Sequence, residues 1–164
     1  MATTQFKGNP AHTVGSLPQV GQTLPDFVLV DNGLADVTLA TYAGKKKVLN
    51  IFPSVGTGIC SASVRTFNQK AGSLDNTVIL NISMDLPFAQ KQFCGAEGIE
   101  AAITLSAFRS AFGQDYGVTL ADSPFKGLLA RVVIVANAAN VVTYVELVSD
   151  IVVEPNYEAA LAAL

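Results

Sequence analysis

The stretch that organises this chain is residues 48–60, which read Val48-Leu49-Asn50-Ile51-Phe52-Pro53-Ser54-Val55-Gly56-Thr57-Gly58-Ile59-Cys60. Its first part is an apolar run typical of a buried strand, its middle is a Pro/Gly turn, and its last residues are the expected start of a helix. Cys60 is thereby placed near a helix N-terminus, where unpaired backbone N–H groups and the positive end of the helix dipole favour a thiolate. Because the thiolate is the nucleophilic form of cysteine, this placement indicates a reactive thiol.

The rest of the chain alternates between predicted strands and predicted helices. The predicted strands are short apolar or alternating runs bounded by turn residues: Thr4–Lys7, His12–Val14, Asp26–Val30, Asp36–Leu39, Lys47–Phe52, Thr77–Ser83, Ala130–Val135 and Val141–Leu147. The predicted helices are Gly58–Leu74, Leu86–Cys94, Ser106–Ala111 with Ser106 as its cap, and a C-terminal helix with Pro155 in its first turn, ending near Leu164.

This order predicts an α/β fold with a central mixed sheet that contains a parallel pair and is flanked by helices. The first two strands, which turn at Gly8-Asn9-Pro10, predict an N-terminal β-hairpin extension. The pattern is compatible with a thioredoxin-like architecture, although the order of elements alone does not separate it from other α/β folds.

Length and composition predict one globular domain over residues 1–164, because half of the residues are apolar and only 14% are charged. The net charge of −3 argues against nucleic acid and anionic membrane surfaces as partners. The most apolar region, Gly127 to Val145, is interrupted by Arg131, so we expect buried strands and not a membrane span. The first residues show no secretory signal, which favours the cytoplasm and leaves a periplasmic location open.

The chain has two cysteines, Cys60 and Cys94, which are too few for a disulfide framework in a domain of this size. A disulfide between them would therefore be a catalytic or sensing state. Cys94 by itself is most typical of a buried small hydrophobic residue. However, Gly95 and Gly98 make the Cys94 segment easy to unwind. The 34-residue separation of Cys60 and Cys94 excludes a Cys-X-X-Cys motif.

Two further residues can support chemistry at Cys60. Thr57, three residues earlier, can direct its hydroxyl at a thiolate or an incoming oxygen, and it can also cap the helix. Arg131 interrupts the apolar run Leu128–Val135, and a charge buried there needs an anion. That anion can be a thiolate or a carboxylate, so both interpretations stay open. Arg65 and Arg109 are expected at the surface.

Other catalytic classes find little support in the sequence. His12 is the single histidine and lies in the extended N-terminal region, so Cys–His and Ser–His–Asp catalysis lack a base. Two cysteines and one distant histidine do not suggest a zinc site, and no glycine-rich phosphate loop is present. Asp85 and Glu97 lack the partner spacing of paired catalytic carboxylates. The residues therefore favour neither a zinc site nor a phosphate-binding loop.

Several segments resemble one known family. The pattern Pro53-x-x-x-Thr57-x-x-Cys60 is similar to the active-site segment of thiol peroxidases, the atypical two-cysteine peroxiredoxins of bacteria. The likeness continues through four further segments and so spans nearly the whole chain: Ser83–Gln90, Phe93–Gly98, Gly127–Arg131 and Glu154–Leu161. One departure is Gly56, where the family usually has Asp, which affects the expected loop rigidity and substrate preference.

The resemblance implies a peroxiredoxin fold and a complete reaction cycle. Cys60 would be the peroxidatic cysteine and Cys94 the resolving one, with Pro53, Thr57 and Arg131 completing the peroxide site. Hydrogen peroxide and alkyl hydroperoxides would be reduced through a Cys60 sulfenic acid and an intramolecular Cys60–Cys94 disulfide. Thioredoxin would reopen the disulfide, no metal, haem or flavin would take part, and the chain would be a homodimer. The alternatives are a redox-switched binding protein and a protein thiol–disulfide oxidoreductase.

Overall fold

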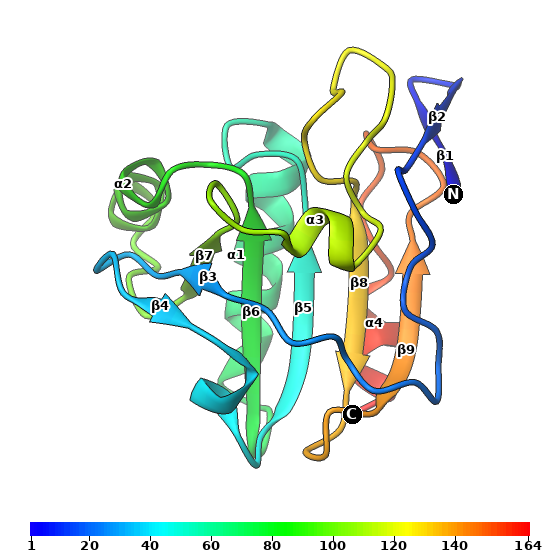
Figure 1. The fold of residues 1–164 in the computed structure, drawn as a ribbon. Coiled ribbons are helices and arrows are strands. Elements are labelled where there is room, and N and C mark those ends of the chain that lie inside the picture. The colour runs from blue at the N-terminus through cyan, green and yellow to red at the C-terminus, as the bar shows by residue number, and fades with distance from the viewer.

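The computed structural model describes residues 1–164, and its centre is a seven-stranded mixed sheet in the order β4-β3-β7-β6-β5-β8-β9 (Figure 1). The strands of this sheet are β3 (Leu29–Val30), β4 (Asp36–Val37), β5 (Lys46–Ile51), β6 (Thr77–Ser83), β7 (Ile103–Ser106), β8 (Val132–Ala136) and β9 (Val142–Leu147). A separate two-stranded hairpin is formed by β1 (Thr3–Phe6) and β2 (Asn9–His12). The helical elements are η1 (Leu39–Tyr42), α1 (Gly58–Ala71), α2 (Pro87–Glu97), α3 (Phe112–Asp115) and α4 (Tyr157–Ala162).

The middle of the sheet sets the position of the residues that follow β5. Strands β5, β6 and β7 are parallel, whereas β8 runs antiparallel to β5. Consequently β5 ends and β8 begins at the same end of the sheet (Figure 1). The turn after β5, the start of α1 and the residue before β8 therefore meet at one edge.

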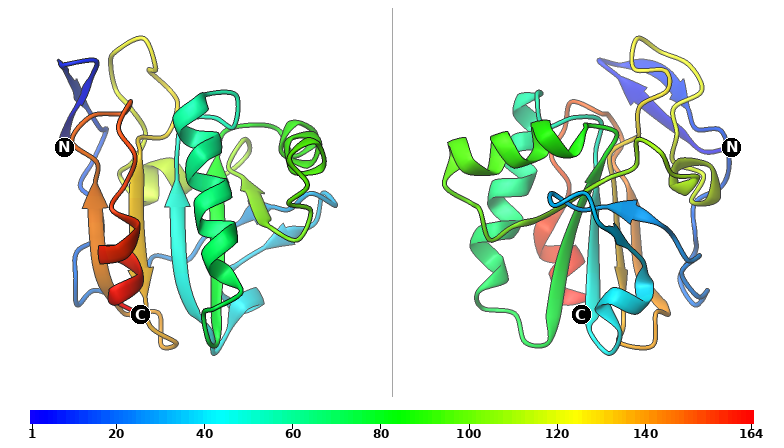
Figure 2. Two further views of the ribbon diagram at one scale, coloured as in Figure 1. Left: turned by 180° about the vertical axis from the view of Figure 1, so that it is seen from behind. Right: turned by 60° about the vertical axis from the view of Figure 1, so that its left-hand side comes forward.

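Helices cover both faces of the sheet. Helices α1 and α4 lie on one face, seen in front in the left view of Figure 2, and α3 lies on the opposite face. Strand β8 shows the consequence, because side chains alternate along a strand. Val132 and Ile134 belong to the large core on the α3 side, while Val133 and Val135 pack in the smaller core with Phe67 of α1. Burial of both faces explains why β8 is apolar throughout.

Most predicted elements are confirmed, some with shifted ends. Strand β6 has the predicted bounds, β5 and α1 differ by a few residues, and β8 and β9 form the expected antiparallel pair. The second hairpin, β3 with β4, is shorter than predicted. The mixed sheet and its flanking helices confirm the predicted α/β fold class. No helix of the protein is both long and apolar enough to cross a membrane.

The helix predicted at Ser106–Ala111 is wrong, because Ser106 is the last residue of the unpredicted strand β7. The Ser106 hydroxyl donates to the Asp85 carbonyl and not to a helix N-terminus. Strand β7 has only four residues, and its pairing with β6 and β3 holds it in the sheet. The single-turn helix α3 begins later, at Phe112. Such a short strand is specified by its neighbours more than by its own pattern.

Three other boundaries also differ from prediction. The N-terminal hairpin turns at Lys7-Gly8, both with positive φ, so Asn9 and Pro10 belong to β2. A turn with two positive φ values matches the twist of a hairpin, and Pro10 is accommodated in a two-stranded ribbon. Helix α2 extends beyond Cys94 to Glu97. Pro155 precedes Asn156, which caps α4 by accepting from the Ala159 N–H, so Pro155 is not in the first helical turn.

The close approach between Gly117 and the backbone of Ser16 gives a test of how the segment after α3 packs against the N-terminal segment. Gly117 has φ +66, and an added Cβ would lie 2.3 Å from the carbonyl oxygen of Ser16. We expect Gly117→Ala to lower the free energy of unfolding by about 3 kcal/mol, measured by urea denaturation, because backbone strain and a backbone clash combine. Gly44→Ala is the control, since Gly44 has φ +79 and open space around it. Equal losses in both variants would contradict the close approach.

Candidate active site

Thr57 and Cys60 form the start of α1 as the sequence predicted. Thr57 is the N-cap residue, with extended backbone (φ −99, ψ 145), and its Oγ1 accepts the Cys60 N–H at 3.4 Å. The Thr57 hydroxyl also donates to the Ser54 carbonyl at 3.4 Å, which holds the turn between β5 and α1. Cys60 lies in the first turn of α1 and is 0% exposed. The thiol is thus buried at the positive end of the helix dipole.

Arg131 lies directly against the Cys60 thiol. Its Nη2 donates to the Cys60 Sγ at 3.2 Å, and its Nε donates to the Ile151 carbonyl at 2.8 Å. The side chain is 2% exposed, and no carboxylate lies within ion-pair distance of it. The carboxylate partner that the sequence left open is therefore absent. A buried guanidinium without a counter-ion stabilises negative charge on the neighbouring sulfur.

The second terminal nitrogen of this guanidinium, Nη1, is buried and has no hydrogen-bond partner. A buried donor without an acceptor costs free energy unless a ligand or water satisfies it. Since Nη1 belongs to the same planar group that contacts Sγ, an oxygen held beside the sulfur can accept from it. The guanidinium at the thiol therefore keeps one buried donor nitrogen that is free to bind an acceptor.

Apolar side chains surround the thiol on its other sides. Cys60 packs with Phe52 and Val64, and three partly buried residues contact this small cluster: Val55, Phe93 and Ile99. Pro53 is buried directly after Phe52, at the beginning of the turn. A desolvated setting strengthens the electrostatic interaction between sulfur and guanidinium. Because Phe93 precedes Cys94, the cluster also connects Cys60 with the second cysteine segment.

Cys94 occupies a different environment in helix α2. It is 2% exposed, and its Sγ lies 3.9 Å from the Thr104 Oγ1 on β7. Burial raises the pKa of the Cys94 thiol, and the Thr104 hydroxyl opposes this rise to a smaller extent. Both cysteines are free thiols. A disulfide between them therefore requires Cys94 to leave Thr104, because each sulfur has its own separate partner.

The remaining charged residues singled out in the sequence lie away from the thiol. His12 pairs with Asp122, with 2.7 Å between Nδ1 and Oδ2. As predicted, Arg65 and Arg109 are partly exposed, and they pair with Glu97 and Asp36 respectively. None of these groups contacts Cys60 by a hydrogen bond, so Arg131 is the charged group at the thiol.

One carboxylate to which the sequence analysis assigned no catalytic role reaches the turn before α1. The Asp85 carboxylate accepts from the Ser54 hydroxyl at 2.6 Å and from the Val55 N–H at 2.9 Å. Asp85 follows β6 and is separated from Ser54 by 31 residues, so no local spacing indicated this contact. The parallel pairing of β5 and β6 brings the two segments together.

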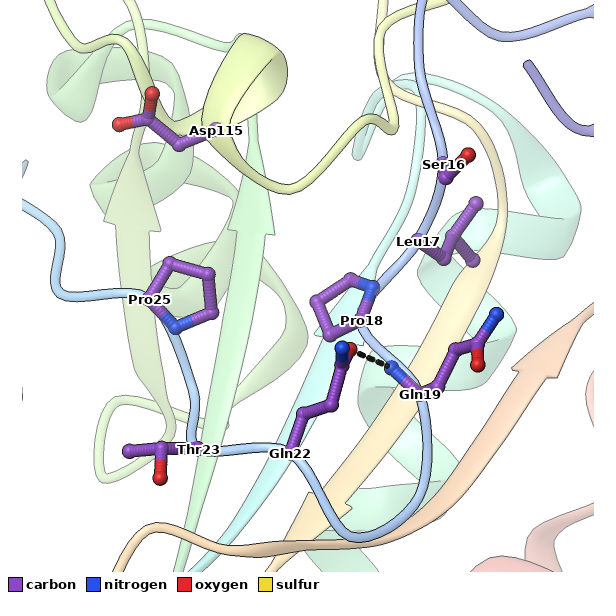
Figure 3. A pocket seen from close by; sticks show the side chains of 8 residues that line it. All are labelled: Ser16, Leu17, Pro18, Gln19, Gln22, Thr23, Pro25 and Asp115. Carbon is purple, nitrogen blue, oxygen red and sulfur yellow. Dashed lines mark hydrogen bonds between the residues drawn. The ribbon is translucent and has the colours of Figure 1, made fainter.

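A surface cavity of about 460 Å³ lies elsewhere, between the segment from Ser16 to Pro25 and Asp115 at the end of α3 (Figure 3). The Gln22 side-chain oxygen accepts from the Gln19 N–H across its rim at 2.8 Å. Its lining contains neither cysteine nor arginine, and Asp115 is its single ionisable side chain. This cavity therefore has no part in the thiol chemistry.

Comparison with known proteins agrees with this geometry. Residues 19–161 match the Redoxin family model. The chain is 56% identical over 164 residues to a thiol peroxidase of Corynebacterium glutamicum and 53% identical to one of Mycobacterium tuberculosis, and each match covers 100% of this chain and 99% of the relative.

Solved structures give the same result. A peroxiredoxin-like protein from Aquifex aeolicus superimposes with a TM-score of 0.91 at 33% identity, covering 99% of this chain and 95% of that structure. A thiol peroxidase from Chromobacterium violaceum gives 0.89 at 25% identity, covering 97% and 93%. The buried thiol at the start of α1, the fold and the full-length similarity lead to one conclusion: this chain belongs to the thiol peroxidase family of Redoxin-domain peroxiredoxins.

Proposed function

We propose that this thiol-dependent peroxidase reduces hydroperoxides with Cys60 as the attacking thiol and Cys94 as the thiol that resolves the product. The observation that carries the proposal is the Arg131 guanidinium, which contacts the Cys60 sulfur through Nη2 while its buried Nη1 has no partner. One group can thus stabilise the thiolate and hold the substrate oxygen at the same time.

In the first step the Cys60 thiolate attacks the terminal oxygen of a hydroperoxide. A sulfur–oxygen bond forms, the O–O bond breaks, and the electron pair leaves on the departing oxygen, which takes a proton to become water or an alcohol. Arg131 stabilises the negative charge on that oxygen. The Thr57 hydroxyl, which donates to the Ser54 carbonyl and accepts from the Cys60 N–H, is proposed to orient the substrate. Pro53 supports the turn and shields it from water.

In the second step the Cys94 sulfur attacks the Cys60 sulfenic acid, the S–S bond forms and water leaves. Because Cys94 is buried against Thr104, its segment must unwind first. A dithiol protein of the thioredoxin type then reduces the disulfide by exchange and becomes oxidised itself. Hydrogen peroxide and small alkyl hydroperoxides are the proposed substrates, and a homodimer is the proposed assembly.

The alternatives, a redox-switched binding protein and a protein thiol–disulfide oxidoreductase, are less well supported. A protein thiol–disulfide oxidoreductase needs a thiol that a protein substrate can reach, whereas Cys60 is fully buried. A redox-switched binding protein gives no role to the unpartnered guanidinium nitrogen beside that thiol. A small peroxide fits this setting better than a protein substrate.

Substitution of each cysteine by serine should block a different step of the proposed cycle. We expect Cys60→Ser to abolish peroxide consumption in a coupled thioredoxin assay. Cys94→Ser should retain the single oxidation of Cys60 but form no disulfide within the chain, as measured by mass analysis after one equivalent of peroxide. Turnover that persists in Cys60→Ser would disprove the assigned role of Cys60, and a wild-type disulfide between two chains would disprove intramolecular resolution.

Arg131 should be needed for its shape as well as its charge. Arg131→Lys keeps the charge but cannot reach both Sγ and the Ile151 carbonyl with a planar fork, so we expect single-turnover oxidation of Cys60 to slow by about 10²-fold. Arg109→Lys is the matched control, because Arg109 is largely exposed and pairs with Asp36. Equal rates of Cys60 oxidation in the two variants would show that Arg131 has a structural role and does not assist the reaction.

The raised pKa of Cys94 predicts a pH dependence of stability. The folded chain holds the Cys94 proton more tightly than the unfolded chain does, so stability should fall as the pH rises above the ordinary thiol pKa toward the raised one. Urea denaturation from pH 8 to pH 10 on wild type and on Cys94→Ala isolates this contribution, since the other titrating groups are common to both. Parallel pH profiles would contradict the prediction.

A further inference from the structure

The Asp85 carboxylate joins two segments by accepting three hydrogen bonds. Its Oδ1 accepts from the Ser54 hydroxyl at 2.6 Å, and its Oδ2 accepts from the Val55 N–H at 2.9 Å and from the Ser83 hydroxyl at 2.6 Å. Ser54 and Val55 belong to the turn that leads into α1 and Cys60. Ser83 is the last residue of β6, so the carboxylate fastens this turn to the central sheet.

The same chain of bonds continues to helix α2. The Ser83 hydroxyl oxygen accepts from the Gln90 Nε2 at 3.1 Å, and Nε2 also donates to the Leu105 carbonyl at 2.9 Å. Gln90 is fully buried and lies four residues, about one helical turn, before Cys94. A continuous path, Ser54 to Asp85 to Ser83 to Gln90, therefore connects the turn that carries Cys60 with the helix that carries Cys94.

Helix α2 depends on this path for its attachment to the sheet. Its buried residues are Pro87, Gln90 and Cys94. A helix of 11 residues is marginal without tertiary contacts. When Cys94 leaves Thr104, Gln90 is the remaining buried polar anchor of α2. The Gln90 Oε1 is buried without a partner, a penalty that water relieves once the helix opens.

We propose that Asp85 is a positioning residue that holds the Cys60 turn and helix α2 together in the peroxide-reactive arrangement, so that the two segments release in a coupled way when Cys94 moves to Cys60. This inference rests on the proposed function, in which Cys60 and Cys94 form a disulfide. The bonds from Ser54 and Val55 to Asp85 exist only while the Cys60 turn is in place, and the bond from Gln90 to Ser83 exists only while helix α2 is in place. They favour the first step of the cycle, attack on peroxide, and oppose the second.

A second link between the cysteine segments is weaker. Arg65 of α1 and Glu97 of α2 approach to 3.3 Å, but their side chains are 39% and 35% exposed. Exposed ion pairs contribute little because water and salt screen them. Hydrogen bonds to a charged, partly buried carboxylate are stronger, so the Asp85 path governs the coupling.

The test is Asp85→Asn, which replaces one acceptor oxygen by an NH₂ donor that faces other donors. Oxidation of Cys60 by one equivalent of peroxide should slow by about tenfold, the size expected for a lost hydrogen bond to a charged group. Formation of the Cys60–Cys94 disulfide from the sulfenic acid should accelerate by a similar factor. At excess peroxide, less of Cys60 should then reach the sulfinic acid, which forms when a second peroxide oxidises the sulfenic acid.

Hydrogen exchange on the reduced protein provides a readout that does not depend on the chemistry. Asp85→Asn should increase exchange in residues 54–59 and in residues 87–97 together, and leave β8 and β9 unchanged. Asp75→Asn is the matched control, since Asp75 is exposed and its side chain makes no hydrogen bond. Ser54→Ala provides a second variant in case Asp85→Asn folds poorly, and it should shift both rates in the same directions by a smaller factor.

The outcomes decide separately between this inference and the proposed function. Slowing of both chemical steps, or faster exchange in only one of the two segments, would overturn the role of Asp85. If the wild-type chain forms no Cys60–Cys94 disulfide, the proposed function fails, and the exchange experiment still shows whether Asp85 couples the two segments.

Discussion

The buried contact between the Arg131 guanidinium and the Cys60 sulfur is the interaction around which the site is built. A charge without a counter-ion in a protein interior costs several kcal/mol, so the surrounding structure must hold it in place. Three features do so: the pairing of β8 with β5, the Ile151 carbonyl that accepts from Nε, and the helix start that directs Cys60 inward. The penalty is offset only when negative charge develops beside the guanidinium, as it does in thiolate attack on a peroxide.

The proposed cycle places two opposed requirements on the site. In that cycle, attack on peroxide needs a fixed turn, a capped helix and a desolvated thiol, whereas disulfide formation needs the Cys94 segment to leave its burial site. The polar path through Asp85, Ser83 and Gln90 connects these requirements physically, because its bonds exist in the folded arrangement alone. The unpartnered Gln90 Oε1 lowers the cost of leaving that arrangement.

The sequence predicted the local elements of the fold better than the contacts between them. Strands β5, β6, β8 and β9 and helix α1 follow from apolar periodicity, and Thr57 as a cap follows from its position before the helix. Strand β7 was not predicted because its four residues are held in the sheet by β3 and β6. The helix predicted from Ser106 was wrong for the same reason, since Ser106 is the last residue of that strand. The partner of Arg131 stayed open between a thiolate and a carboxylate, since both satisfy a buried charge equally well in a one-dimensional pattern.

The sequence by itself determined that Cys60 lies at a helix start, that no histidine near it in the chain can act as a base, and that a second cysteine lies in a segment whose glycines allow it to unwind. These are local properties, set by residues within a few positions of one another. The tertiary structure alone decided that Arg131, 71 residues away, contacts the sulfur, and that Asp85 connects the two cysteine segments. The register of β5 with β6 and β8 creates those contacts, and register depends on the packing of the whole sheet.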